Sequence, residues 1–248
     1  MQEVPTGPWA GFVCQLALLG GLGAGVGLSG PGWVVGVACA VVTSLLLVRA
    51  MVRHGTARLG PAGRVTLTRA ILSGGVAALV AASFGGPIPV GVVVGLSVTA
   101  LVLDGVDGWV ARRTGTATVF GARFDMEVDA FLILVLSVYV ASTTGWWVLI
   151  IGAARYVFVA AGRVVTWLRG TLPPRAWAKV VAAIQGIVLT AASTGVLPQD
   201  LQELALGAAL LLLSESFGRE VLGLWRLHEA RRGERGGDLV AAGGVGDG

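Results

Sequence analysis

The chain has 248 residues, of which 55% are hydrophobic and only 13% are charged, and its mean hydropathy is +0.81. A soluble domain would carry about twice that charged fraction, so the composition excludes this class and predicts a polytopic helical membrane protein. The net charge of +4 does not indicate nucleic-acid binding, because the basic residues lie in loops between apolar stretches.

Eight apolar stretches follow one another along the chain, and each is near the roughly 20 residues that a membrane-spanning helix needs. They cover 10–29, 33–52, 65–84, 87–106, 128–144, 146–168, 178–195 and 201–225. Glycine- and proline-containing breaks separate them. From residue 228 the tail is polar and then rich in glycine, so we expect 228–248 to be a disordered cytoplasmic tail.

The distribution of basic residues predicts the orientation. The connections near residues 30, 86, 145 and 198 contain no Lys or Arg, whereas the alternate connections and the tail contain several. The positive-inside rule therefore predicts that both termini, and the acidic residues between 104 and 129, lie on the cytoplasmic side, and we expect the membrane to be a bacterial plasma membrane.

Four aspartates stand at the facing ends of two neighbouring stretches. Asp104 and Asp107 share one helical face, and Asp125 and Asp129 share another, so an antiparallel hairpin brings the two pairs together. Buried charges need partners, and four carboxylates suit hard cations such as Mg²⁺ or Mn²⁺, two of which would lie roughly 3.5–4 Å apart. Helix capping, or an ion relay in a transporter, is the alternative interpretation.

These aspartates belong to a longer pattern with fixed spacing. The chain reads Asp104-x2-Asp107-Gly108-x2-Ala111-Arg112-x8-Gly121-x3-Asp125-x3-Asp129. This resembles the signature of the CDP-alcohol phosphatidyltransferases, D-x2-D-G-x2-A-R-x8-G-x3-D-x3-D, and every fixed position is met. An ion relay would not need the two glycines, the alanine and the arginine at these spacings.

The resemblance covers roughly residues 61–225 and implies an all-α fold. Its six-helix core would form a catalytic membrane domain at 61–227, and residues 1–60 would add a pair of N-terminal transmembrane helices and a loop. The resemblance also implies a homodimer.

The activity implied by the resemblance is transfer of a substituted phosphate from a CDP-alcohol to a hydroxyl acceptor, with release of CMP. We expect CDP-diacylglycerol or a related CDP-alcohol as donor, a role in phospholipid biosynthesis, and two divalent cations, Mg²⁺ or Mn²⁺. Asp104, Asp107 and Asp125 would be metal ligands, and Asp129 would be both a ligand and the general base. The nucleotide would be bound by Gly108, Ala111, Arg112, Gly121, Thr66 and Arg69.

Thr66 and Arg69 form a separate motif. The segment Thr66-x2-Arg69 resembles the T-x-x-R at the start of the first core helix of the family, although Gly63 stands where an asparagine is frequent. Arg69 can equally be read as an interfacial residue that extends its charged end toward water.

Basic residues later in the chain are candidates for acceptor binding. Arg155 and Arg163 lie in one apolar stretch on broadly the same side of a helix, where each needs an acceptor phosphate or a carboxylate of the aspartate cluster as partner. The segment from Lys179 to Gln185 loosely resembles the glycerophosphate-using branch. We therefore expect a phosphorylated polyol, such as glycerol 3-phosphate or inositol phosphate. Glu215 is predicted either to pair with one of these arginines or to be a structural carboxylate at a helix interface.

Overall fold

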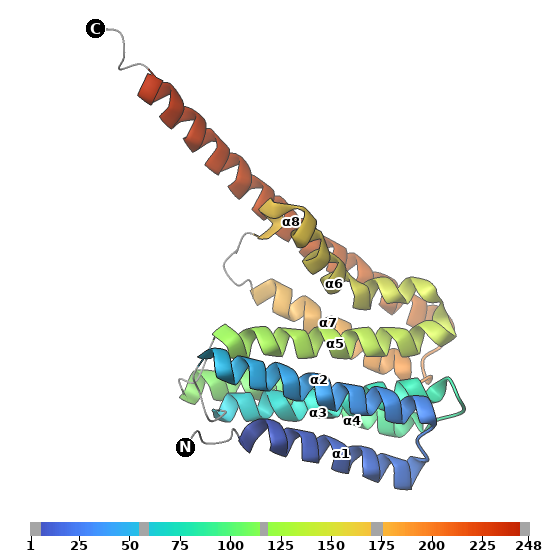
Figure 1. Cartoon of the computed structure of the whole chain (residues 1–248). Helices are drawn as coiled ribbons and strands as arrows, with labels where there is room; N and C mark the ends of the chain where they lie inside the picture. The colour runs from blue at the N-terminus through green and yellow to red at the C-terminus, as the bar shows by residue number, and fades with distance from the viewer. Residues whose placement is uncertain (1–5, 55–59, 115–118, 170–175, 244–248) are drawn as a thin grey trace, which may run out of the picture.

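The structure is a computed structural model that describes residues 6–54, 60–114, 119–169 and 176–243. Side chains are described in these ranges except at Thr6, His54, 107–112, Thr114, 119–120, Thr166, Arg169, Ala176 and 230–243. The described chain forms eight α-helices and no strand (Figure 1), which confirms the all-α prediction. The helices are α1 (Thr6–Val26), α2 (Gly30–His54), α3 (Pro61–Ser83), α4 (Val90–Thr114), α5 (Val119–Thr144), α6 (Leu149–Val164), α7 (Ala176–Ser193) and α8 (Gln199–Gly243), with 3-10 helices η1 (Trp146–Val148) and η2 (Thr166–Arg169).

Successive helices run in opposite directions, so the described connections that lack Lys and Arg gather at one end of the bundle (Figure 1). Glycines allow two of these reversals: Gly145, between α5 and η1, has φ 139°, and Gly195, after α7, has φ 66°. The other end holds basic residues near helix termini, namely Arg49, Arg53, Arg64, Arg113, Arg123 and Lys179. The predicted orientation depends on this uneven distribution of basic residues between the two ends of the bundle.

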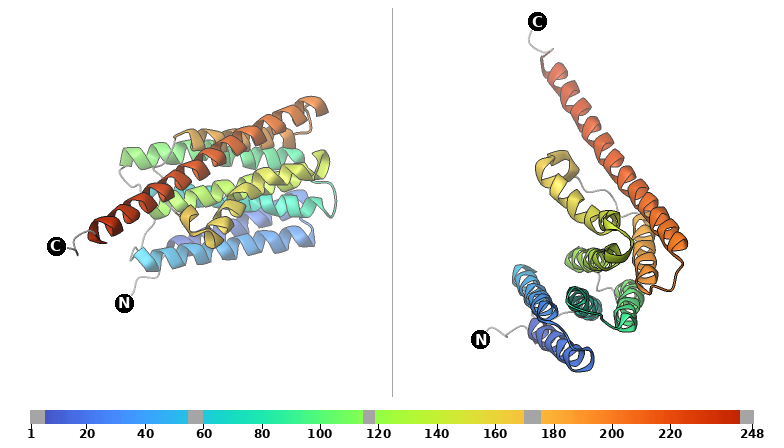
Figure 2. Two further views of the ribbon diagram at one scale, coloured as in Figure 1. Left: turned by 90° about the horizontal axis from the view of Figure 1, so that it is seen from above. Right: turned by 90° about the vertical axis from the view of Figure 1, so that its right-hand side faces the viewer.

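Helix α3 occupies the middle of the bundle and packs against α1, α2, α4 and α5 (Figure 2). Its buried residues are mostly small, as in the run from Ser73 to Ala78. Because lipid tails are as apolar as leucine, membrane helices associate through close packing of small residues, which explains this composition. The core around α3 is completed by side chains such as Leu136 of α5 and Leu189 of α7, both fully buried.

Five of the described helices are long and apolar enough to cross a membrane: Gly7–Val26, Gly30–Arg53, Pro61–Ser83, Trp146–Val164 and Gln199–Glu229. Shorter apolar helices cover Val90–Val106 and Trp177–Ser193. The opening turns of α5 are more polar, because they carry Arg123, Asp125, Glu127 and Asp129. The chain is a polytopic helical membrane protein, as its composition predicts.

The two N-terminal helices are packed closely onto the rest of the bundle. A Cβ atom added at Gly36 of α2 would lie 2.4 Å from Leu19 Cδ2 of α1 and 3.1 Å from Ala78 Cβ of α3. At Gly32 it would lie 2.8 Å from the carbonyl oxygen of Ala78. Glycine at these positions therefore lets α2 contact both neighbouring helices at backbone distance.

The segment for which the sequence predicts disorder, from residue 228, begins within a helix. Helix α8 continues to Gly243 and projects beyond the other helices (Figures 1 and 2). The physical reason is local propensity: the segment after Leu227 contains Glu229, Ala230, Arg231 and Arg232, all good helix formers. Low hydropathy indicated the end of the membrane span, but it does not by itself end a helix.

Candidate active site

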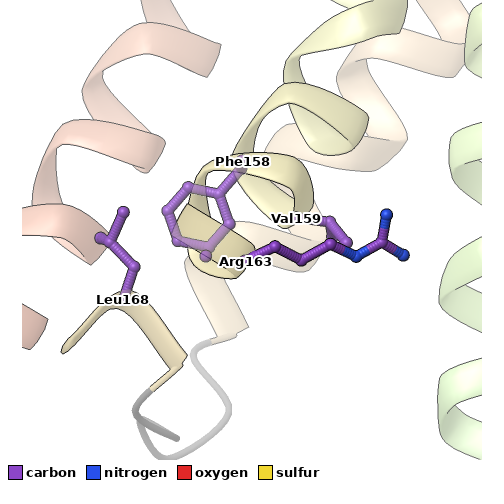
Figure 3. A pocket seen from close by; sticks show the side chains of 5 residues that line it. Phe158, Val159, Arg163 and Leu168 are labelled. Carbon is purple, nitrogen blue, oxygen red and sulfur yellow. The ribbon is translucent and has the colours of Figure 1, made fainter. Parts of the chain in front are cut away.

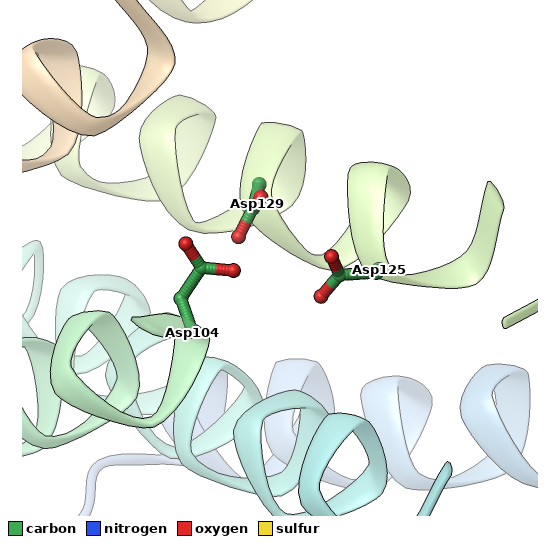
Figure 4. A group of neighbouring side chains, drawn as sticks. All are labelled: Asp104, Asp125 and Asp129. Atoms are coloured by element: carbon green, nitrogen blue, oxygen red, sulfur yellow. The ribbon is translucent and has the colours of Figure 1, made fainter. Parts of the chain in front are cut away.

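Three carboxylates from two helices meet inside the bundle. Asp104 of α4 and both Asp125 and Asp129 of α5 each offer an oxygen, and these oxygens lie within 4.8 Å of one another. Figure 4 shows the three side chains directed toward a common space between the two helices. They are 37%, 30% and 28% exposed, respectively, so the cluster is partly accessible. The predicted convergence of acidic residues from the two helices is therefore seen for these three aspartates.

The sequence spacing explains this convergence. Asp125 and Asp129 are four residues apart and so share a face of α5. Asp104 lies ten residues before the end of α4, and Asp129 lies ten residues after the start of α5, so both are about 15 Å from the same end of the bundle at 1.5 Å per residue. That end is the one that holds the basic helix termini.

Arg69 of α3 lies among the three aspartates. Its side chain is only 1% exposed, and its Nε donates to the carbonyl oxygen of Ala100 at 3.1 Å. Nη1 is 2.9 Å from Oδ1 of Asp104 and also donates to Oδ1 of Asp125. Nη2 donates to Oδ1 of Asp129. Arg69 is therefore an internal ion-pair partner, and the interpretation as an interfacial residue that extends toward water is wrong.

The other residues with an implied nucleotide role are only partly described. Thr66 is buried one turn before Arg69, and its hydroxyl donates to the carbonyl oxygen of Ala62 at 3.2 Å. Gly121 lies one turn before Asp125 on α5, half-buried. Four motif residues lie on α4 with side chains outside the described residues: Asp107, Gly108, Ala111 and Arg112. The grouping of all four aspartates thus stays a prediction for Asp107.

Arg155 lies beside a carboxylate that the sequence analysis missed. Its Nη2 donates to Oε1 of Glu127 at 2.5 Å, which joins α6 to α5. Glu127 stands between Asp125 and Asp129 in sequence, but successive helical residues are about 100° apart, so it points to the opposite side of α5. The partners predicted for Arg155 are an acceptor phosphate or a carboxylate of the aspartate cluster, whereas the structure shows a carboxylate outside that cluster.

Arg163 and Lys179 lie nearer the end of the bundle. Arg163 extends from α6 at an open pocket that is also lined by Phe158, Val159, Gly162 and Leu168 (Figure 3). Lys179 is exposed in the first turn of α7. Arg155 and Arg163 both belong to α6, but the contacts described for Arg155 tie it to α5, whereas Arg163 lines this pocket near η2.

Glu215 and Gln185 connect helices. Oε2 of Glu215 accepts a hydrogen bond from Trp177 Nε1 at 2.9 Å, and its Oε1 pairs with Arg219 one turn later on α8. This matches the interpretation of Glu215 as a structural carboxylate at a helix interface. Gln185 is fully buried, and its Nε2 donates to the carbonyl oxygen of Ala209 at 2.8 Å. Both side chains therefore fasten α7 to α8.

Comparison with known proteins gives one family. The family model described as CDP-alcohol phosphatidyltransferase matches residues 61–214, from the first turn of α3 into α8, while α1 and α2 lie outside the match. No match is found among curated proteins or among solved structures. The matched segment is more than half of the chain and contains all three clustered aspartates and Arg69. The chain belongs to the CDP-alcohol phosphatidyltransferase family.

Proposed function

We propose that this enzyme transfers a phosphatidyl group from CDP-diacylglycerol to the hydroxyl group of a phosphorylated polyol and releases CMP. Members of its family transfer substituted phosphate groups from CDP-alcohols to alcohols, and the nature of donor and acceptor is the proposed part. The observation that carries the proposal is the convergence of Asp104, Asp125 and Asp129 within 4.8 Å. A CDP-linked lipid carries a diphosphate, whose charge must be neutralised at the edge of the membrane.

The three clustered carboxylates are suitable ligands for divalent cations. Carboxylate oxygens are the ligands that Mg²⁺ and Mn²⁺ prefer, and these three come from helices, so their spacing is held by the fold. Asp107 would add a fourth carboxylate, since it lies three residues after Asp104 on α4. Bound there, two cations would neutralise the diphosphate and stabilise the charge that develops on the departing CMP.

The protein residues would bind and orient the two substrates. Thr66, Gly108, Ala111, Arg112 and Gly121 are the proposed nucleotide-binding residues, and the small ones among them would let the cytidine approach the helix backbone. The acyl chains of the donor would remain in the lipid, and the diphosphate would reach the cluster from the end of the bundle that holds the basic helix termini, which is the nearer of the two ends.

Asp129 is the proposed general base. It would take the proton from the acceptor hydroxyl while the hydroxyl oxygen forms a bond to the phosphorus that carries the lipid. The bond between that phosphorus and the bridging oxygen of CMP breaks, and CMP leaves with the electron pair. Oδ1 of Asp129 accepts from Arg69, so we assign the proton to Oδ2.

Arg155, Arg163 and Lys179 are the proposed acceptor-binding residues. A phosphate on the acceptor would be held by charge-assisted hydrogen bonds, which are stronger than bonds between neutral groups. Arg155 would have to release Glu127, which lies on the side of α5 opposite to Asp125 and Asp129, and move toward the aspartate cluster to hold the phosphate. Both side chains of the pair are partly exposed. This reasoning favours a phosphorylated polyol over a neutral amino alcohol as acceptor.

The proposed orientation puts the cluster on the cytoplasmic side of a bacterial plasma membrane. A CDP-linked lipid in the membrane and a phosphorylated polyol dissolved in the cytoplasm would both reach it there. The supporting feature is the set of basic residues at the same end of the bundle. A homodimer is the expected assembly and stays a prediction.

The experiment is a product assay with purified enzyme, labelled CDP-diacylglycerol, Mn²⁺ or Mg²⁺, and a panel of acceptors that includes glycerol 3-phosphate, inositol phosphate, serine and inositol. We expect CMP release and a labelled phospholipid phosphate with one of the first two acceptors. A product only with serine or inositol would contradict the proposed acceptor class. An absence of CMP release from every CDP-alcohol tested would contradict the transfer reaction and favour the ion-relay alternative.

A further inference from the structure

We infer that Arg69 is a positioning residue that holds Asp104, Asp125 and Asp129 in the arrangement that binds divalent cations. The inference rests on the proposed function, because it concerns how the proposed ligands are kept in place. In this role Arg69 contacts the metal-binding aspartates, whereas the T-x-x-R motif implies that it contacts the nucleotide.

The first argument is the geometry of the guanidinium group. All three of its nitrogens are used: Nε on the carbonyl oxygen of Ala100, Nη1 between Asp104 and Asp125, and Nη2 on Asp129. A planar group with donors in a rigid fork can fix several carboxylates at once, which an ammonium group cannot do. The bond from Nε to the backbone of α4 also fixes the plane of the fork.

The second argument is the side from which Arg69 makes these contacts. The arginine side chain is 1% exposed, whereas the aspartates are 28–37% exposed. Arg69 therefore lies on the buried side of the cluster, and the accessible side is the one from which a cation or a diphosphate would arrive. A cation can bind on this outer side without displacement of the arginine.

The third argument is electrostatic. Three carboxylates whose oxygens lie within 4.8 Å repel one another, and without a cation between them they would turn apart. With three carboxylates and one guanidinium, the formal charge of the group is −2, the magnitude carried by one divalent cation. Because α3 packs against both α4 and α5, Arg69 can hold ligands from both helices in one arrangement before any metal binds.

A different role for the same residue gives the opposite result. Arg69 could instead occupy the position of the cations in the metal-free protein and move away from the aspartates when the cations bind. In that role it would compete with the cations. Its removal would then strengthen cation binding. The two roles are therefore distinguished by the direction in which the dissociation constant changes.

The test measures the dissociation constant for Mn²⁺ alone, by electron paramagnetic resonance, on the purified full-length protein in detergent. The variants are Arg69→Gln and Arg69→Lys, with Arg64→Gln as the matched control, since Arg64 is an exposed arginine on the same helix. We expect Arg69→Gln to raise the dissociation constant for Mn²⁺ about 10- to 100-fold, the usual effect of losing a group that orients metal ligands. Arg69→Lys should restore only part of the affinity, because it returns the charge without the fork.

Circular dichroism and thermal melting without metal show whether each variant is folded. Where Arg69→Gln does not fold, Arg69→Lys decides alone, with an expected loss of about tenfold or more in Mn²⁺ affinity. Unchanged or tighter Mn²⁺ binding in the folded variants would overturn the inference, as would full rescue by lysine.

The inference and the proposed function can fail separately. Mn²⁺ binding that depends on Arg69, in an enzyme that releases no CMP from any CDP-alcohol, would support the inference and contradict the function. CMP release by a wild-type enzyme that binds no Mn²⁺ would overturn the inference and leave the transfer reaction in place.

Discussion

Arg155 of α6 donates from Nη2 to Oε1 of Glu127 of α5 at 2.5 Å, and both side chains are partly exposed. The pair lies on the side of α5 opposite to Asp125 and Asp129, because Glu127 is offset by two residues from each. An exposed ion pair of this kind contributes little to stability, about 0–1 kcal/mol. Its removal should therefore change function more than folding if Arg155 takes part in acceptor binding.

The first prediction separates the two roles of Arg155. Replacement Arg155→Gln should raise the KM for a phosphorylated acceptor about 10- to 100-fold, since a hydrogen bond to a charged group contributes about 1.5–3 kcal/mol. The KM for the CDP-linked donor should stay unchanged. Replacement Glu127→Gln should leave the acceptor KM unchanged or lower it, because Arg155 no longer has to exchange a carboxylate for the phosphate. Steady-state kinetics with each substrate varied in turn provides the measurement.

If Arg155 serves only to join α6 to α5, the two variants should behave alike. Both would then show the same small loss of thermal stability and the same acceptor KM as the wild type. That result would remove Arg155 from the acceptor site and leave Arg163 and Lys179 as the remaining candidates.

The second prediction concerns Asp129 as general base. Replacement Asp129→Asn should lower kcat by about 10²- to 10⁴-fold, the usual contribution of a positioned base. Because Asp129 is also a proposed ligand, the assay should be repeated at rising Mn²⁺ concentration. Loss of a ligand alone would be compensated by more metal, whereas loss of the base would not. Glu127→Gln is the matched control, an acid-to-amide change two residues away on the same helix. Recovery of full turnover at high Mn²⁺ would contradict the assignment of the base.

The third prediction concerns metal dependence. Chelation by EDTA should abolish CMP release, and either Mn²⁺ or Mg²⁺ should restore it. Replacement Asp107→Asn should raise the metal concentration needed for half-maximal activity about 10-fold or more, because it removes one of the four proposed carboxylate ligands. A titration identical to that of the wild type would exclude Asp107 from the metal site.

The acidic cluster could be predicted because its geometry is local. Spacing of three and four residues fixes which aspartates share a helical face, and the short link between the two stretches makes the helices antiparallel. The position of Arg69 depends on a long-range fact, namely that α3 packs against both α4 and α5. One signal was available in the sequence: α3 contains no acidic residue, so an arginine inside this span must find its partners on other helices.

The partner of Arg155 was missed for a related reason. The same requirement for a counter-ion predicted that Arg155 needs a carboxylate or a phosphate, but it did not say which helix faces α6. Glu127 lies between two motif aspartates in sequence but points to the opposite side of α5. That direction follows from helical periodicity alone, but the identity of the partner required the knowledge that α6 packs against this side of α5, which the Arg155–Glu127 pair shows.

The fourth prediction tests how α6 is held against α5. A Cβ atom at Gly152 would lie 2.6 Å from the Cα atom of Leu134 and 3.0 Å from the Cβ atom of Ser137, so Gly152→Ala must push α6 away from α5. We expect a loss of about 1–3 kcal/mol in stability and a weaker Arg155–Glu127 pair, since Arg155 follows one turn later. Thermal unfolding in detergent is the measurement. The control is Gly207→Ala on α8, where, apart from the adjoining backbone of α8 itself, no atom of the described residues lies within 4 Å of the added methyl group. Equal melting temperatures for the two variants would contradict this account.

The fifth prediction tests on which side of the membrane the cluster lies. Val196, 83% exposed in the connection between α7 and α8, belongs to the end without Lys or Arg, whereas Arg64 lies at the opposite end. In a protein with Cys14 and Cys39 replaced by alanine, Val196→Cys should react with a membrane-impermeant maleimide in intact cells. Arg64→Cys should react only after lysis, because the positive-inside rule assigns the basic end to the cytoplasm. The reverse pattern would put Asp104, Asp125 and Asp129 on the outer side. A cytosolic acceptor phosphate could not reach them there, and the proposed reaction would have no access to its substrates.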